Sequence, residues 1–123
     1  MNAEELLRNL EMSGDFRDGL TTVRIDRERF APFCTRLVDG FGLPLSLLFA
    51  TDDRSEGSGF GVHALFSLDA SHERLLVSIS VPEGDPRYPS LTRTIMAAHW
   101  YERYAMDMFG IVADGHPDPR RLV

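Results

Sequence analysis

The sequence predicts a single α+β domain, in which helices pack on one face of a mixed or antiparallel sheet of about four strands. Two observations lead to this prediction. Three segments place apolar residues at helical spacing, and four shorter segments either alternate apolar and polar residues or are apolar throughout. The expected order of elements is α-β-α-β-β-β-α, and a length of 123 residues fits one domain.

The first third of the chain is predicted to form two helices separated by a strand. Residues 3–12 carry apolar side chains at helical spacing, and residues 20–25 alternate as a strand does. A longer helix is predicted to begin after Asp26 and to end near Gly40. Its apolar face is formed by Phe30, Phe33, Cys34, Leu37, Val38 and Phe41.

Three strands are predicted in the middle of the chain. Residues 45–50 are mostly apolar, which is typical of a central strand. Residues 60–68 and 75–81 alternate, and the polar segment 69–72 between them predicts an antiparallel hairpin.

A loop and a helix are predicted after the last of these strands. Two prolines and a glycine make residues 83–90 a loop. A helix is expected over residues 92–109, with Ser90 or Thr92 as its N-terminal cap.

Composition excludes several classes of function. A net charge of −6 gives no basic surface for nucleic acid or anionic lipid. The apolar runs are too short for direct membrane insertion. The one cysteine, Cys34, cannot form an internal disulfide, iron–sulfur cluster or structural zinc site. We therefore expect a cytoplasmic protein without a cofactor.

Few local signals of chemistry lie outside the C-terminal segment. Cys34 falls on the apolar face of a predicted helix, so we interpret it as a packing residue. The glycine run 57–61 leads into a strand and lacks the lysine of a phosphate-binding loop, so we interpret it as a hairpin turn. A zinc site formed by His99, His116 and nearby carboxylates stays an alternative.

The helix expected over residues 92–109 mixes charged and aromatic residues. One half of its helical wheel is apolar and includes Trp100, whereas the other half holds Glu102, Arg103 and Asp107 beside further apolar residues. Two interpretations stay open. Either this is a core helix with a solvated salt bridge, or a partner covers its mixed face.

The terminal segment 111–123 follows the expected main body, residues 1–110, as part of the same domain. Pro117 and Pro119 stiffen it, which reduces the entropy that it would lose on docking. We therefore expect a partner interface and no catalytic, cofactor-binding or metal-binding residues. The interface residues are predicted to be Trp100, Glu102, Arg103, Asp107, Phe109, His116, Asp118, Arg120 and Arg121.

A spaced motif occupies the same region. It comprises Glu102, Arg103, Asp107, Met108, Phe109, His116 and Arg120, preceded by Tyr88-Pro89-Ser90-Leu91 and Ala97-Ala98-His99-Trp100-Tyr101. At these residues, within about 88–122, the chain resembles the 30 kDa subunit family of respiratory complex I, the family of the NADH dehydrogenase C protein. That family includes a related subunit or domain of membrane-bound NiFe hydrogenases.

The resemblance implies a non-catalytic assembly subunit of a complex I-like oxidoreductase, without a redox centre of its own. The complex would be an NADH:quinone oxidoreductase or an energy-converting NiFe hydrogenase. The resemblance also implies docking against the large subunit, the one related to NiFe hydrogenases, and a cytoplasmic position at the membrane periphery. Tyr104 stands where the family usually has a second Glu, and the chain stops at Val123; both favour the hydrogenase branch.

Two other functions stay open at this stage. A small-ligand-binding module or enzyme would gather His99, Glu102, Arg103 and Asp107 around a pocket. An α+β adaptor would bind a partner unrelated to redox chemistry.

Overall fold

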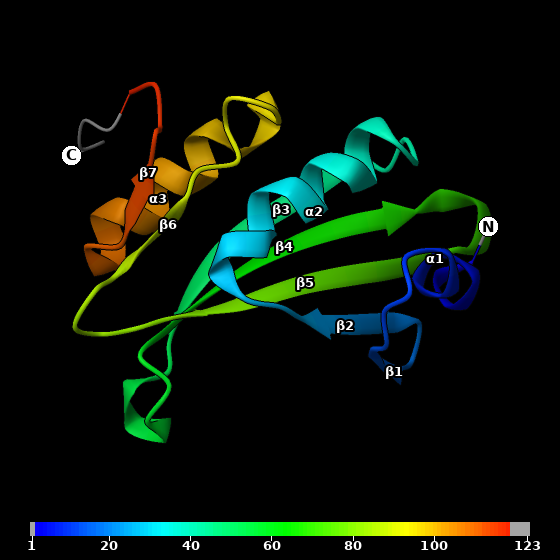
Figure 1. The fold of residues 1–123 in the computed structure, drawn as a ribbon, viewed down its shortest axis with the longest axis horizontal. Coiled ribbons are helices and arrows are strands. Elements are labelled where there is room, and N and C mark those ends of the chain that lie inside the picture. The colour runs from blue at the N-terminus through cyan, green and yellow to red at the C-terminus, as the bar shows by residue number, and fades with distance from the viewer. Residues whose placement is uncertain (1, 119–123) are drawn as a thin grey trace.

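A five-stranded sheet organises the computed structural model, which describes residues 2–118 (Figure 1). The strand order is β1-β2-β5-β4-β3. The β2–β5 pair is parallel and the other three pairs are antiparallel. The strands are β1 Asp15–Arg17, β2 Leu20–Arg24, β3 Leu45–Asp52, β4 Phe60–Leu68 and β5 Glu73–Val81.

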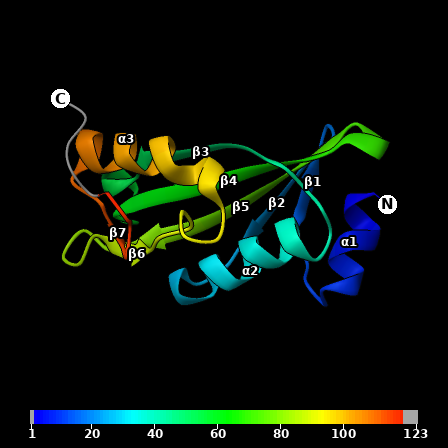
Figure 2. The ribbon, with the colours of Figure 1, turned by 90° about the horizontal axis from the view of Figure 1, so that it is seen from above.

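Three α-helices lie on one face of this sheet: α1 Ala3–Asn9, α2 Arg27–Asp39 and α3 His99–Phe109 (Figure 2). The predicted α+β class with one-sided helices is therefore confirmed. The helix α2 buries Phe30, Cys34 and Leu37 against the sheet, as its apolar spacing indicates.

The predicted hairpin is confirmed by β4 and β5, which pair in register from Phe60↔Val81 to Leu68↔Glu73. A short 3-10 helix, η2 (Asp69–Ser71), connects the two strands. The glycine run before β4 also forms a turn, as predicted. It follows the 3-10 helix η1 (Arg54–Glu56), and Gly57 adopts a left-handed φ of 80°.

The prediction of a central strand over residues 45–50 is wrong, because β3 is an edge strand of the sheet. Its apolar character has another cause. Leu48 is buried on the helix side, while Leu47 and Phe49 extend toward the outer side, and α3 packs alongside the strand. Apolar surroundings on both sides of an edge strand produce the same sequence pattern as a central position.

A second, two-stranded sheet corrects the loop prediction for residues 83–90. The strand β6 (Arg87–Pro89) pairs in parallel with β7 (Val112–Asp114), which lies inside the expected terminal segment. Each strand is three residues long, and the partners lie far apart in sequence. Short strands of this kind have no period-2 pattern that can be recognised in a sequence.

The first and last helices are shorter than predicted. The helix α1 ends at Asn9, and the turn after it leads into the unpredicted strand β1. The last helix does not begin at residue 92. A 3-10 helix, η3 (Met96–Ala98), precedes α3, and Ala98 stands at the cap position that was assigned to Ser90 or Thr92.

Candidate functional site

The carboxylate of Glu102 lies inside the domain and is 0% exposed. Its Oε2 accepts hydrogen bonds from the Tyr88 phenol at 2.6 Å and from the Leu91 amide at 3.0 Å. Its Oε1 accepts from the Ser90 hydroxyl at 2.6 Å, and from the hydroxyl and amide of Thr92 at 2.5 and 3.2 Å. A buried carboxylate with five donors is fully satisfied, so Glu102 fixes the 88–92 turn onto α3.

This anion influences the two titratable groups that lie near it. Burial, followed by the charge of Glu102, raises the pKa of the Tyr88 phenol well above its ordinary value. Burial, again followed by Glu102, raises the pKa of the Cys34 thiol. Cys34 is 0% exposed, so its interpretation as a packing residue is confirmed.

Arg103 is also buried, at 8% exposed. Its guanidinium lies 3.6 Å from the Asp118 carboxylate and 5.1 Å from the centroid of the Trp100 ring. The interpretation of a solvated salt bridge is therefore wrong for Arg103. The guanidinium instead ties the segment after β7 to α3 and supports one face of the indole.

His116 anchors the same segment from another direction. The Asp118 amide donates to His116 Nδ1 at 3.0 Å, and this bond assigns the ring proton to Nε2. Nε2 lies 3.2 Å from the His99 carbonyl oxygen, to which it can then donate. The ring is 6% exposed and packs against the His99 ring with a centroid separation of 4.9 Å.

Backbone bonds complete the attachment of the terminal segment. The Ser90 amide donates to the Asp114 carbonyl at 2.8 Å, and the Arg93 guanidinium donates to the Gly115 carbonyl at 2.6 Å. Residues 112–118 are therefore held by the turn that Glu102 organises.

The side of α3 opposite Glu102 carries four exposed apolar residues at intervals of four, which we call the apolar stripe. It comprises Met96, Trp100, Tyr104 and Met108, whose exposed fractions are 71%, 64%, 60% and 55%. Charged residues of α3 are thus buried while its large apolar residues face outward. This reverses the usual distribution for a helix at a protein surface.

An apolar groove of about 510 Å³ runs between the stripe and the edge of the sheet, and we call it the β3–α3 groove. Its size lies within the range of ligand-binding clefts. Tyr101 closes part of it by donating from its phenol to the Ser46 carbonyl at 3.3 Å. The groove is lined by Leu47, Leu48, Phe49, Ala50, Trp100, Tyr101, Tyr104, Ala105, Met108 and Phe109.

The structure separates the predicted interface residues into three groups. Trp100 is exposed, whereas Glu102, Arg103 and His116 are buried. The half-buried members are Asp107, Phe109 and Asp118, and the predicted contacts of Arg120 and Arg121 lie outside the described residues. Sequence reasoning missed the donors to Glu102 and the open edge of β3. The one signal for the donors was the motif segment Tyr88-Pro89-Ser90-Leu91.

The alternative cluster of His99, Glu102, Arg103 and Asp107 does not gather around one point. Glu102 points into the 88–92 turn, and Arg103 reaches toward Asp118. Within residues 2–118, no three His, Cys, Asp or Glu side chains are placed to hold a metal ion together. No observation in this part of the chain favours the small-ligand or enzyme alternative.

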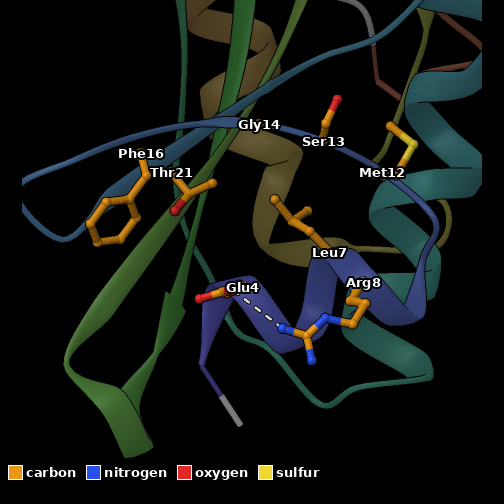
Figure 3. Close-up of a pocket in the computed structure, with 8 residues that line it drawn as sticks. All are labelled: Glu4, Leu7, Arg8, Met12, Ser13, Gly14, Phe16 and Thr21. Carbon is orange, nitrogen blue, oxygen red and sulfur yellow. Dashed lines mark hydrogen bonds and ion pairs between the residues drawn. The ribbon is translucent and has the colours of Figure 1, made fainter.

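A second cavity, of about 550 Å³, lies far from the motif, between α1 and the β1–β2 hairpin (Figure 3). Glu4 and Arg8 form an exposed ion pair of 3.2 Å at its rim. The hydroxyl of Thr21 is buried there without a hydrogen-bond partner among the described residues. The cavity is lined by Glu4, Leu7, Arg8, Met12, Ser13, Gly14, Phe16 and Thr21.

A chain of hydrogen bonds crosses the sheet face that the helices leave uncovered. The Thr51 hydroxyl donates to Asp53 at 3.1 Å, so Thr51 accepts from His63 Nε2 at 2.9 Å. His63 Nδ1 then accepts from the Ser78 hydroxyl at 2.7 Å. Burial and the nearby Arg24 lower the pKa of His63, and Asp53 opposes this shift.

Comparison with known proteins identifies the family. The chain matches the family model for the 30 kDa subunit of respiratory-chain NADH dehydrogenase over residues 23–123. The chain belongs to this family. The resemblance that the C-terminal motif indicated is therefore confirmed, and the bonds to Glu102 connect two parts of the 30 kDa motif in space.

Relatives in the 30 kDa family differ in length. The chain is 35% identical over 117 residues to the C/D subunit of the NADH-quinone oxidoreductase of Methylococcus capsulatus, covering 86% of this chain and 20% of that protein. It is 36% identical over 115 residues to the C subunit of the same type of enzyme in Acidithiobacillus ferrooxidans, covering 85% of this chain and 56% of that protein. The chain therefore spans about half the length of the Acidithiobacillus protein.

Relatives also include a hydrogenase-type protein. The chain is 38% identical over 80 residues to formate hydrogenlyase subunit 5 of Escherichia coli, covering 64% of this chain and 14% of that protein. The groups named by the sequence resemblance are thus both represented among the relatives.

Solved structures have the same fold. A trypsin-resistant fragment of Nqo5 is 29% identical, with a TM-score of 0.80, covering 96% of this chain and 99% of the fragment. A chain of an archaeal membrane-bound sulfane sulfur reductase has a TM-score of 0.75 at 18% identity, covering 92% of this chain and 68% of that one. This second likeness supports the fold alone. In the described part of this chain, no helix is long and apolar enough to cross a membrane.

Proposed function

We propose that this chain is a non-catalytic assembly subunit of a complex I-like oxidoreductase, and that it docks against the large subunit. The complex is an NADH:quinone oxidoreductase or an energy-converting NiFe hydrogenase, and the protein is cytoplasmic and peripheral to the membrane. Support comes from membership of the 30 kDa family and from relatives whose names denote subunits of such complexes.

The observation that carries this proposal is the orientation of α3. Glu102 and Arg103, two residues of the family motif, form bonds inside the domain, whereas Trp100, Tyr104 and Met108 face outward. Aromatic residues and Met are enriched at protein interfaces, and a contiguous exposed apolar surface marks an interaction site. The motif therefore places the apolar stripe for a partner to cover.

The choice of partner follows from the relatives. The name of the Methylococcus relative joins the letters C and D in one subunit, and this chain covers 20% of it. In that protein, the related segment and further sequence belong to one polypeptide. A close and lasting contact between this chain and a large subunit agrees with that arrangement. The departure at Tyr104 favours the hydrogenase branch.

Co-expression of the whole chain with a tagged large subunit from the same source tests the proposal. We expect both to elute together in equal amounts. Tyr104→Ala should weaken binding by about tenfold, since buried aromatic residues dominate interface energies. The matched control is Phe16→Ala, because Phe16 is 66% exposed at the other end of the domain. Recovery of the wild-type chain only as a free monomer would contradict the proposal.

A further inference from the structure

We infer that the open edge of β3 pairs with an extended, uncharged apolar segment of the partner protein, which adds one strand to the sheet and fills the β3–α3 groove. This inference rests on the proposed function and names the form in which the partner binds.

The direction of the backbone groups of β3 gives the first step. The Asp53 amide donates to the Gly59 carbonyl at 2.9 Å, so this pair faces β4. In an antiparallel pair, every second residue bonds to the neighbouring strand and the residues between point away. Following the register along β3, Phe49 faces β4, whereas the amides and carbonyls of Leu48 and Ala50 point to the open edge.

The phenol of Tyr101 confirms this alternation, because it reaches the outward carbonyl of Ser46. Beyond that bond, no hydrogen bond from residues 2–118 reaches the outward amides of Leu48 and Ala50. The edge also lacks the usual protection against pairing. Residues 45–51 contain no proline and no charged side chain.

Charge supports a partner strand in preference to a second copy. The ten residues that line the groove are all uncharged, although 26% of the chain is charged. An occupant of matching character is apolar, with Trp100, Tyr104 and Met108 as one wall of its site. Each copy of this chain carries a net charge of −6, so pairing two copies brings like charges together.

Strand addition also explains why the groove and the edge occur together. Main-chain hydrogen bonds supply affinity in this mode, and pockets for alternate side chains supply specificity. A lipid surface would cover the apolar stripe but would leave the amides of Leu48 and Ala50 without acceptors. An extended polypeptide satisfies both.

Amide hydrogen exchange on the whole chain, alone and in complex with the large subunit, tests the inference. We expect exchange at Leu48 and Ala50 to slow by about tenfold or more in the complex. Phe49 is the internal control, because its amide faces β4 in both states.

Substitution at Ala50 gives a second measurement. Ala50→Pro removes an amide that the isolated sheet does not use, and proline is tolerated on edge strands. We expect it to weaken binding of the large subunit by about tenfold or more. Ala50→Ser keeps the amide and should bind as the wild type does. If Ala50→Pro does not fold, Tyr104→Lys places a charge in the groove wall and should weaken binding similarly.

The outcomes separate the two proposals. A complex in which Leu48 and Ala50 exchange as fast as in the free chain overturns strand addition and leaves the proposed function intact. Slow exchange in the free chain together with a dimer mass assigns the edge to a second copy, which also overturns it. If the wild-type chain binds no large subunit, the proposed function itself fails.

Discussion

The phenol of Tyr88 donates to the carboxylate of Glu102 at 2.6 Å, across 14 positions of sequence. Both residues are buried. The bond joins the tyrosine that opens the family's lead-in to the first acid of its motif, and it positions β6 against α3. The motif is therefore a structural element first, and whatever it presents to a partner depends on this buried cluster.

Glu102→Gln should destabilise the domain. The amide side chain keeps the shape, but its NH₂ group faces donors where the carboxylate accepted hydrogen bonds. We expect a loss of about 2–4 kcal/mol in the free energy of unfolding, measured by urea denaturation, because hydrogen bonds to charged groups are the stronger ones. Glu28→Gln is the control, because the Glu28 side chain is 73% exposed. Equal stability of the two variants would show that the donors to Glu102 are dispensable.

Gly61→Ala should also destabilise the domain, for a steric reason. A Cβ at this position would lie 2.6 Å from Thr51 Oγ1, 2.7 Å from His63 Nε2 and 2.8 Å from an Asp53 oxygen. Overpacking of this kind costs about 1–3 kcal/mol. Gly84→Ala is the matched control, since a Cβ there meets no atom within 4 Å. Thermal melts of both variants check the prediction, and a Gly61→Ala midpoint at the wild-type value would contradict it.

His63 should make the domain less stable in acid. Its pKa in the folded state lies below the ordinary value of 6.5, so the unfolded chain takes up a proton at His63 more readily than the folded chain does. The stabilisation is therefore present above this ordinary pKa and is lost as pH falls through the lower pKa of the folded state. Denaturation from about pH 7.5 to about pH 5.5 should show this decline.

A comparison of variants isolates the contribution of His63. His63→Gln should show a shallower decline over the same pH range, because glutamine does not titrate. The control His72→Asn removes an exposed histidine whose left-handed backbone, with φ of 57°, asparagine accepts. If His63→Gln and the wild type lose stability in parallel, the decline belongs to other groups.

Elements with long, regular patterns were predictable from the sequence. The apolar spacing of α2 and the alternation of β4 and β5 each arise from burial of one face, which the sequence records directly. The β6–β7 pair was not predictable in this way. Its three-residue strands owe their pairing to the distant turn at Glu102.

The candidate site was predictable in its position along the chain but not in its orientation. A helical wheel assigns Glu102 and Arg103 to solvent because both are charged. It contains no information on donors from residues 88–92 or on Asp118, and these partners allow both charges to be buried. Once the charges are inside, Trp100 and Tyr104 must face outward. This inversion depends on tertiary contacts that no local pattern records.

His116→Ala should lower the stability of the domain as well as any binding that depends on residues 112–118. The substitution removes the acceptor of the Asp118 amide and the contact with the His99 carbonyl, and it leaves a cavity beside the His99 ring. We expect a loss of about 1–2 kcal/mol in the free energy of unfolding. His72→Asn again serves as the exposed control. A His116→Ala variant that binds the large subunit poorly but melts as the wild type does would mean that the imidazole contacts the partner directly and does not hold the domain together.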